Sequence, residues 1–313
     1  MTRTPGLRGR LPVKPPAERF PLSYLSDYLR QPLPAPVYPI DVTGGIAPNE
    51  WAMLANGPDP TCTTHPNGVG DCGFAARQHA RMAKAASYRQ TETWETSDQL
   101  VAEYLRYDHG QDVGVNLADV LLTWYRKGII KAFAPVDHTD PAAIDSAMEA
   151  FKGVLVGVTL TDDAEQLFSE NLPWTIANGQ QPDSAEGHAI VKVRADGRTL
   201  DDYVTWGCMQ GATLAWSAAA VQEVWVALTS EDEVAKVNMP ALLADINALH
   251  GTGDPAPAPA PVPAPIVAPP GPAGTPTAPS GLLQDLAARA RWVATATGQD
   301  YRGVVEWLRA HRP

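Results

Sequence analysis

A cysteine and a histidine far apart in the sequence have the residue types and settings that thiol chemistry needs. Cys72 follows Asp71 and opens an alanine-rich segment whose composition predicts a helix. A helix N-terminus stabilises a thiolate and supplies free N–H groups for an oxyanion. His188 opens an apolar segment that predicts a strand, from which its imidazole can reach the helix terminus as a base. The two residues predict nucleophilic attack on a carbonyl, with no metal and no organic cofactor.

The elements that position this pair are predicted as helices followed by strands, the α+β class with an antiparallel sheet. Asp196-Gly197 predicts the turn of a hairpin between two of the strands. His79 and His109 fall on helical patterns and are predicted to be surface residues. Helices are expected at residues 72–88, 98–107, 117–127, 141–151 and 239–250, and strands at 153–160, 188–194, 202–206, 213–216 and 223–228.

Proline divides the chain into a central domain and two appendages. Of 30 prolines, nine lie in residues 1–40 and eleven in residues 255–279. The first group predicts an extended basic arm and the second a semi-rigid spacer. We therefore expect an arm at 1–45, a domain at 46–235, a short helix at 236–252, a Pro/Ala linker at 253–280 and a helical hairpin at 281–313.

Charge makes the same division. The formal net charge is −11, and residues 1–40 hold six Lys/Arg against two acidic residues while residues 281–313 hold five against three, so the middle carries −17. Such a surface repels phosphate backbones, which argues against nucleic acid as a partner. No apolar stretch approaches a membrane span, and the Arg/Pro-rich start predicts no signal peptide. A cytoplasmic site of synthesis is expected.

The three cysteines predict a reduced protein without a disulfide framework. Cys62 and His65 precede Cys72 in an apparent loop insertion that could cover or modify a cleft. As a metal site, the grouping lacks a second pair of ligands, so no metal is expected.

Four motifs resemble the papain-like cysteine peptidases, over roughly residues 46–230. They are GDCGFAA around Cys72, GHAIVKV around His188, TWG ending at Gly207, and WAMLAN at 51–56. The nucleophile motif is also similar to that of bacteriocin-processing peptidases, and WAMLAN to a segment of papain-like proteins from actinobacteria and their phages. The resemblance implies a helical part packed on an antiparallel sheet, with Cys72 and His188 as catalytic residues and Asp71, Gly73 and Trp206 in support.

The sequence departs from that family at two positions. Pro66 stands where the family has the glutamine of the oxyanion hole, so Asn67 or Asn56 is the expected donor. Val204 stands where the family has the asparagine that orients the histidine, and a valine cannot do this. Asp202, two residues earlier on the same strand face, is the expected substitute.

The expected function is a papain-like peptidase or amide hydrolase, phage-encoded and virion-associated. Its substrate would be a peptide or protein, with cell-wall peptide as one option. The alternative is a catalytically inactive structural protein of a phage particle, whose segments 1–45 and 281–313 bind other subunits. A further possibility stays open, that the N-terminal arm crosses the cleft as a propeptide would and keeps an enzyme latent.

Overall fold

The computed structural model describes residues 3–11, 22–176, 181–182, 187–230, 232 and 234–249. The chain divides into two compact units, Met1–Ala260 and Pro261–Pro313. The second unit lies outside the described residues, as do the predicted Pro/Ala linker and C-terminal hairpin.

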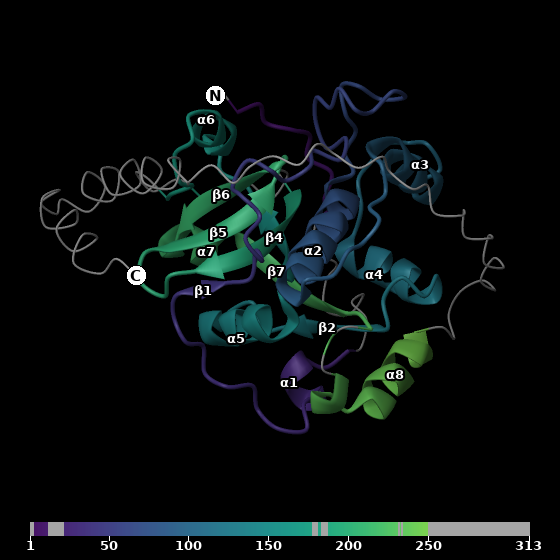
Figure 1. Cartoon of the computed structure of the whole chain (residues 1–313), viewed down its shortest axis with the longest axis vertical. Helices are drawn as coiled ribbons and strands as arrows, with labels where there is room; N and C mark the ends of the chain where they lie inside the picture. The colour runs from purple at the N-terminus through teal and green to yellow at the C-terminus, as the bar shows by residue number, and fades with distance from the viewer. Residues whose placement is uncertain are drawn as a thin grey trace, which may run out of the picture. The chain divides into compact units, whose positions relative to one another are not determined.

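An antiparallel sheet forms the centre of the first unit (Figure 1). Among the described residues it has seven strands, in the order β2-β7-β3-β4-β5-β6, with β1 paired to β4 on the β3 side, beyond the end of β3. Every residue of β3 is buried, which its run of apolar residues predicts. The strands are β1 (Ile40–Asp41), β2 (Ala132–Val136), β3 (Val154–Thr159), β4 (Gly187–Ala195), β5 (Leu200–Thr205), β6 (Cys208–Thr213) and β7 (Val221–Leu228).

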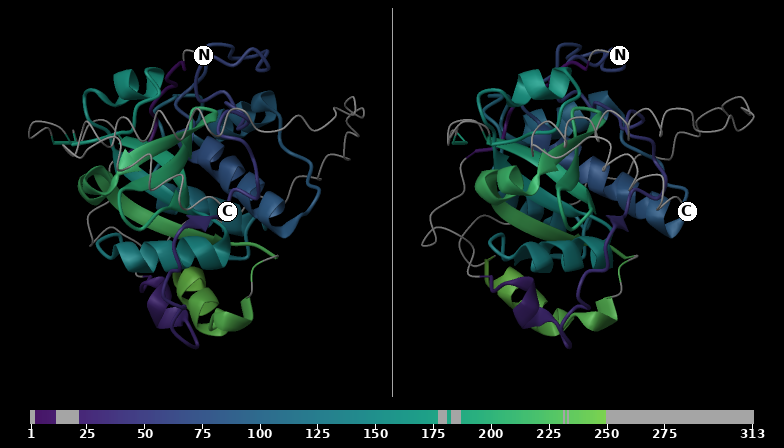
Figure 2. Two further views of the ribbon diagram at one scale, coloured as in Figure 1. Left: turned by 60° about the vertical axis from the view of Figure 1, so that its left-hand side comes forward. Right: turned by 90° about the vertical axis from the view of Figure 1, so that its left-hand side faces the viewer.

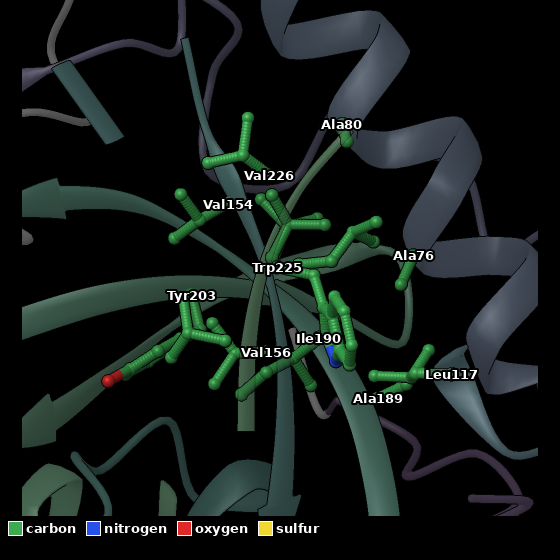
Figure 3. Packing of buried hydrophobic residues seen from close by; sticks show 14 of the residues in the cluster. Ala76, Ala80, Leu117, Val154, Val156, Ala189, Ile190, Tyr203, Trp225 and Val226 are labelled. Carbon is green, nitrogen blue, oxygen red and sulfur yellow. The ribbon is translucent and has the colours of Figure 1, made fainter. Parts of the chain in front are cut away.

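Helix α2 (Cys72–Tyr88) packs directly on the sheet, mainly against β4. Its alanines let the helix approach closely, and Figure 3 shows Ala76 and Ala80 facing strand residues that include Ile190 and Trp225. The helix N-terminus therefore lies beside the sheet, which places Cys72 in the interior.

Three of the other helices, α3 (Ser97–Tyr107), α4 (Leu117–Arg126) and α5 (Pro141–Phe151), begin at capping side chains. Thr96 and Gln99 form a capping box at α3, and Asn116 and Asp140 accept backbone N–H groups at α4 and α5. The others are α1 (Leu25–Tyr28), α6 (Ala164–Ser169), α7 (Leu214–Ala220) and α8 (Met239–Ala248), with a 3₁₀ turn at Val234–Lys236.

One predicted strand is wrong, and some of the observed strands were not predicted. The strand expected at 213–216 is wrong, because the Thr213 hydroxyl accepts the Trp216 N–H and starts α7, while the strand β6 precedes it. Strand β2 was not predicted; it lies at the sheet edge, where a strand tolerates Pro135.

Residues 22–41 pack on the unit and do not extend from it. β1 pairs with β4, and α1 lies against α8 with Tyr28 donating a 2.7 Å hydrogen bond to Asp245 (Figure 2). Within the described residues, no helix combines the length and apolar character needed to cross a bilayer.

Candidate active site

Cys72 is the first residue of α2 and is almost fully buried, at 1% exposure. The backbone N–H groups of Ala189 and Gly9 face its sulfur and favour the thiolate, but burial dominates and raises the thiol pKa to about 12. Ala189 follows His188 in β4, so the sulfur lies beside the N-terminal end of that strand.

His188 is fully buried and held from two sides. Its Nε2 lies 2.7 Å from Thr205 Oγ1, and the Trp206 ring stacks on the imidazole with centroids 4.7 Å apart. Its Nδ1 is buried and has no hydrogen-bond partner within the described part of the chain. The imidazole is therefore fixed in orientation with one nitrogen uncommitted.

Trp206 and Gly207 form the two-residue turn that joins β5 to β6. Both have positive φ, +46° and +70°, as a type I′ turn requires. A tryptophan in this region is strained, and such strain is common at functional sites. The turn points the Trp206 ring onto His188 and puts Thr205 at the end of β5.

The structure does not bring Asp202 to His188. Asp202 pairs with Arg194, six residues along β4 from His188, or about 20 Å at the rise of a strand. Thr205, which the sequence analysis named only as part of a motif, occupies the orienting position predicted for Asp202.

The structure places the two candidate oxyanion donors differently. Asn67 is exposed in the turn closed by the hydrogen bond from the Gly68 N–H to the His65 carbonyl. Asn56 is buried, and its side-chain N–H donates to the carbonyl of Leu7 at 3.1 Å. Asn56 thus binds a peptide carbonyl, and the placement favours it over Asn67.

Residues 3–11, a part of the predicted N-terminal arm that is called the arm from here on, lie across Cys72 and His188 as an extended peptide. The Leu7 N–H donates to the Asn56 carbonyl, and the Leu7 carbonyl also accepts the Trp206 indole N–H at 3.4 Å. The Val115 N–H donates to the Gly9 carbonyl at 2.6 Å. On the opposite side, the Arg10 N–H donates to Gly187, the residue before His188.

The passage for the arm is narrow at Gly9. A Cβ atom on Gly9 would overlap the Gly70 carbonyl, and one on Gly114 would overlap the Gly9 carbonyl. Gly73, the residue after the nucleophile, is also confined, since a Cβ there would lie 2.6 Å from the Val115 side chain. Because these glycines have no side chains, the backbone of the arm at Gly9 can pack against the backbone at Gly70 and Gly114, next to Cys72.

With the arm in the cleft, burial and nearby positive charges disfavour an ion pair between a Cys72 thiolate and a His188 imidazolium. Burial, followed by the charges of Arg8, Arg10 and His79, lowers the pKa of His188 to about 3. With the thiol pKa also raised, Cys72 and His188 are both neutral near pH 7 while the arm is bound.

Asp71 precedes the nucleophile and is fully buried. Its side chain does not cap α2, and neither carboxyl oxygen has a hydrogen bond to any residue that the structure describes, although the Asn56 amide is near enough to favour the charged form. Burial outweighs that contact and raises the pKa of Asp71 well above its usual range.

The structure also defines the surroundings of His79 and Cys62. The prediction that His79 lies on the surface is wrong: it is 2% exposed, its Nε2 lies 2.8 Å from the Ala52 carbonyl, and its ring meets Trp51 edge-on. The sulfur of Cys62 is 3.3 Å from the Asp98 carboxylate, so this thiol ties the preceding loop to the start of α3.

Comparison with known proteins finds a likeness to solved structures. No protein-family model matches it, and no curated protein matches its sequence. Solved structures that resemble it include xylellain, a cysteine protease from Xylella fastidiosa, at 12% identity and a TM-score of 0.49, over 73% of this chain and 98% of that chain. Another comes from work on the mite allergens Blo t 1 and Der p 1, at 11% identity and a TM-score of 0.42, over 70% of this chain and 75% of that chain. At these values neither likeness assigns a function.

Proposed function

We propose that the chain is a papain-like cysteine peptidase or amide hydrolase, with Cys72 as nucleophile and His188 as base. The observation that carries the proposal is the state of His188: Nε2 is bound to Thr205, and Nδ1 is buried and uncommitted in a strand whose next residue faces the Cys72 sulfur. With Nε2–H donating to Thr205 Oγ1, Nδ1 carries the lone pair that accepts the thiol proton.

The reaction follows from these positions. Cys72 Sγ bonds to a substrate carbonyl carbon as its proton passes to His188 Nδ1, and the imidazolium then protonates the departing amine as the C–N bond breaks. Water then attacks the thioester carbon as its proton passes to His188, the C–S bond breaks, and His188 returns the proton to the Cys72 sulfur as the acid is released. The Cys72 backbone N–H and the Asn56 amide are the proposed oxyanion donors, because Asn56 already binds a peptide carbonyl.

The peptide bound in the cleft supports a peptide or protein substrate. Asn56, Val115, Gly187 and Trp206 all make backbone-directed hydrogen bonds to the arm, a mode of binding that any extended peptide can use. In this proposal the arm keeps the enzyme latent, because it covers Cys72 and places two arginines near His188.

The second candidate is a catalytically inactive structural protein of a phage particle. The burial of Cys72 and the uncharged state of both site residues favour it. Association with a phage particle, through residues 1–45 and 281–313 or otherwise, remains a proposal from the sequence.

Alkylation of Cys72 distinguishes the two candidates. Full-length chain with Cys62→Ser and Cys208→Ser isolates one thiol, and Gly9→Val displaces the arm because a side chain there overlaps Gly70. A reactive pair predicts labelling of this protein well below pH ~8.5, the pKa of a free thiol, and its loss on adding His188→Ala.

The control is Thr4→Val, which places the same residue at an exposed arm position without adding bulk and leaves the cleft closed. If the Gly9→Val protein labels only above pH ~8.5 whether or not His188 is present, the proposed enzyme is rejected and the structural candidate stands.

A further inference from the structure

The side chain of Arg10 fills a pocket beside the proposed catalytic pair. Only 2% of that side chain is exposed, and its Nη1 lies 3.0 Å from Glu223 Oε1. Nε and Nη2 both donate to the Val158 carbonyl, at 3.3 and 3.0 Å. The fork of the guanidinium is thus matched by a carboxylate and a carbonyl.

Two paired residues of the sheet, Glu223 and Gly157, provide the charge and the space for this side chain. Glu223 in β7 pairs with Gly157 in β3, and a Cβ atom on Gly157 would lie 2.6 Å from the Glu223 Cγ and 2.9 Å from the Arg10 Cδ. The other carboxylate oxygen, Oε2, accepts the Trp225 indole N–H at 2.7 Å. The Glu223 carboxylate is therefore held in place independently of Arg10. The space for both side chains exists because Gly157 has no side chain.

The pocket lies next to the site. Val158 is the register partner of His188, and the Arg10 N–H donates to the residue before His188. The backbone of this arginine occupies the peptide path while its side chain enters the pocket, and Gly9 passes the narrowest point beside it.

Arg8, another arginine of the arm, differs from Arg10 in its surroundings. Arg8 pairs with Glu165 at 3.0 Å, with side-chain exposures of 21% and 46%. Partly exposed pairs of this kind contribute little, whereas an enclosed guanidinium held by both a carboxylate and a carbonyl discriminates by shape and charge. Of these two arginines, Arg10 is the one whose pocket has the features of a recognition site.

We propose that Glu223, Gly157 and the Val158 carbonyl form a guanidinium pocket of the substrate cleft, selecting peptides that carry arginine next to glycine, and that the arm occupies it as an internal mimic of such a peptide. The substrate preference rests on the proposed function, but the binding of arginine does not. The two are therefore separated by testing binding in a protein that cannot react.

Binding is tested with the full-length Cys72→Ser protein carrying Gly9→Val, which displaces the arm. The probe is a synthetic peptide of residues 3–11, compared with the same peptide containing citrulline in place of Arg10. Citrulline keeps the shape and removes the charge. We expect the citrulline peptide to bind about tenfold weaker or more, and the difference to vanish in Glu223→Gln.

A second measurement avoids any dependence on displacing the arm. Arg10→Ala in the full-length Cys72→Ser protein empties the pocket, and ethylguanidinium should then raise the melting temperature more than ethylammonium does. Arg8→Ala is the matched control and should show no such gain. Equal binding of the two peptides, or equal effects of the two cations on Arg10→Ala, would overturn the proposal.

Hydrolysis is measured separately, with Cys72 restored. Arginine-selective binding without turnover would reject the proposed peptidase and retain the pocket, whereas turnover that is equal for arginine and citrulline peptides would reject the pocket and retain the peptidase.

Discussion

Thr205 orients His188 through a hydroxyl group, which places less negative charge near the imidazolium than a carboxylate would. The hydrogen bond is short and fully enclosed, since both residues are buried. The arrangement fixes the ring but gives the positive form only modest support.

Replacing Thr205 tests this positioning role. Thr205→Val keeps the side-chain shape and leaves the buried Nε2 without a partner, which should lower the free energy of unfolding by about 1–3 kcal/mol. In the Gly9→Val protein it should also shift the pH profile of Cys72 alkylation toward that of a free thiol. Thr205→Ser should restore the profile, and failure of the serine protein to do so would contradict the role.

Asp71 should cost stability at neutral pH. A folded-state pKa above the unfolded value means that unfolding releases a proton, so the cost is absent below pH ~3.8 and grows as the pH rises. Asp71→Asn is therefore expected to stabilise the protein at pH 7.5 more than at pH 4.5, measured by urea unfolding. A pH-independent difference would show that Asp71 ionises normally.

At the scale of elements, the turn at Trp206-Gly207 determines where His188 is held. Gly207 has a positive φ, and a Cβ atom added to it would lie 3.1 Å from the Trp51 carbonyl oxygen. Gly45 also has positive φ, +94°, but has open space around it. The two glycines therefore separate backbone strain from crowding.

Gly207→Ala should destabilise the protein by about 1 kcal/mol or more, because strain and crowding combine. Gly45→Ala, the control, should cost less because it adds only strain. Thermal unfolding of both proteins measures the difference, and equal losses would mean that the contact with Trp51 is unimportant.

Much of the element order could be predicted from the sequence, because helix caps, alanine-rich stretches and β-branched runs are local signals. The hydrogen-bond partner of His188 could not be predicted in this way. A bulge between Lys192 and Arg194 shifts the pairing of β4 with β5 by one residue, so counting back from the Asp196-Gly197 turn misplaces the far end of the strand. The path of the arm and the pairing of Arg10 with Glu223 depend on tertiary contacts that no local pattern encodes.

For the molecule as a whole, two buried histidines contribute to the loss of stability in mild acid. His79 and His188 have pKa values lowered to about 4 and about 3, mainly by burial. Each stays neutral in the fold but takes a proton on unfolding below pH ~6.5, so stability is lost as the pH falls from there toward the folded pKa values.

The size of this effect can be measured with His79→Gln, which retains a hydrogen-bonding group near Ala52. Removing one histidine should make the loss of stability between pH 6.5 and pH 4 smaller by about 3 kcal/mol. Urea unfolding across that range is the measurement, with His109→Gln, an exposed site, as the control that should leave the slope unchanged.

The arm is joined through the chain to β1, which is itself hydrogen-bonded into the sheet. A ligand tethered in this way acts at an effective concentration in the millimolar range, whatever the concentration of the protein. Dilution cannot release it, and a peptide with only weak affinity cannot displace it. The cleft thus imposes a threshold: a competitor must exceed the local concentration of the arm, or the arm must be severed, before Cys72 meets another peptide.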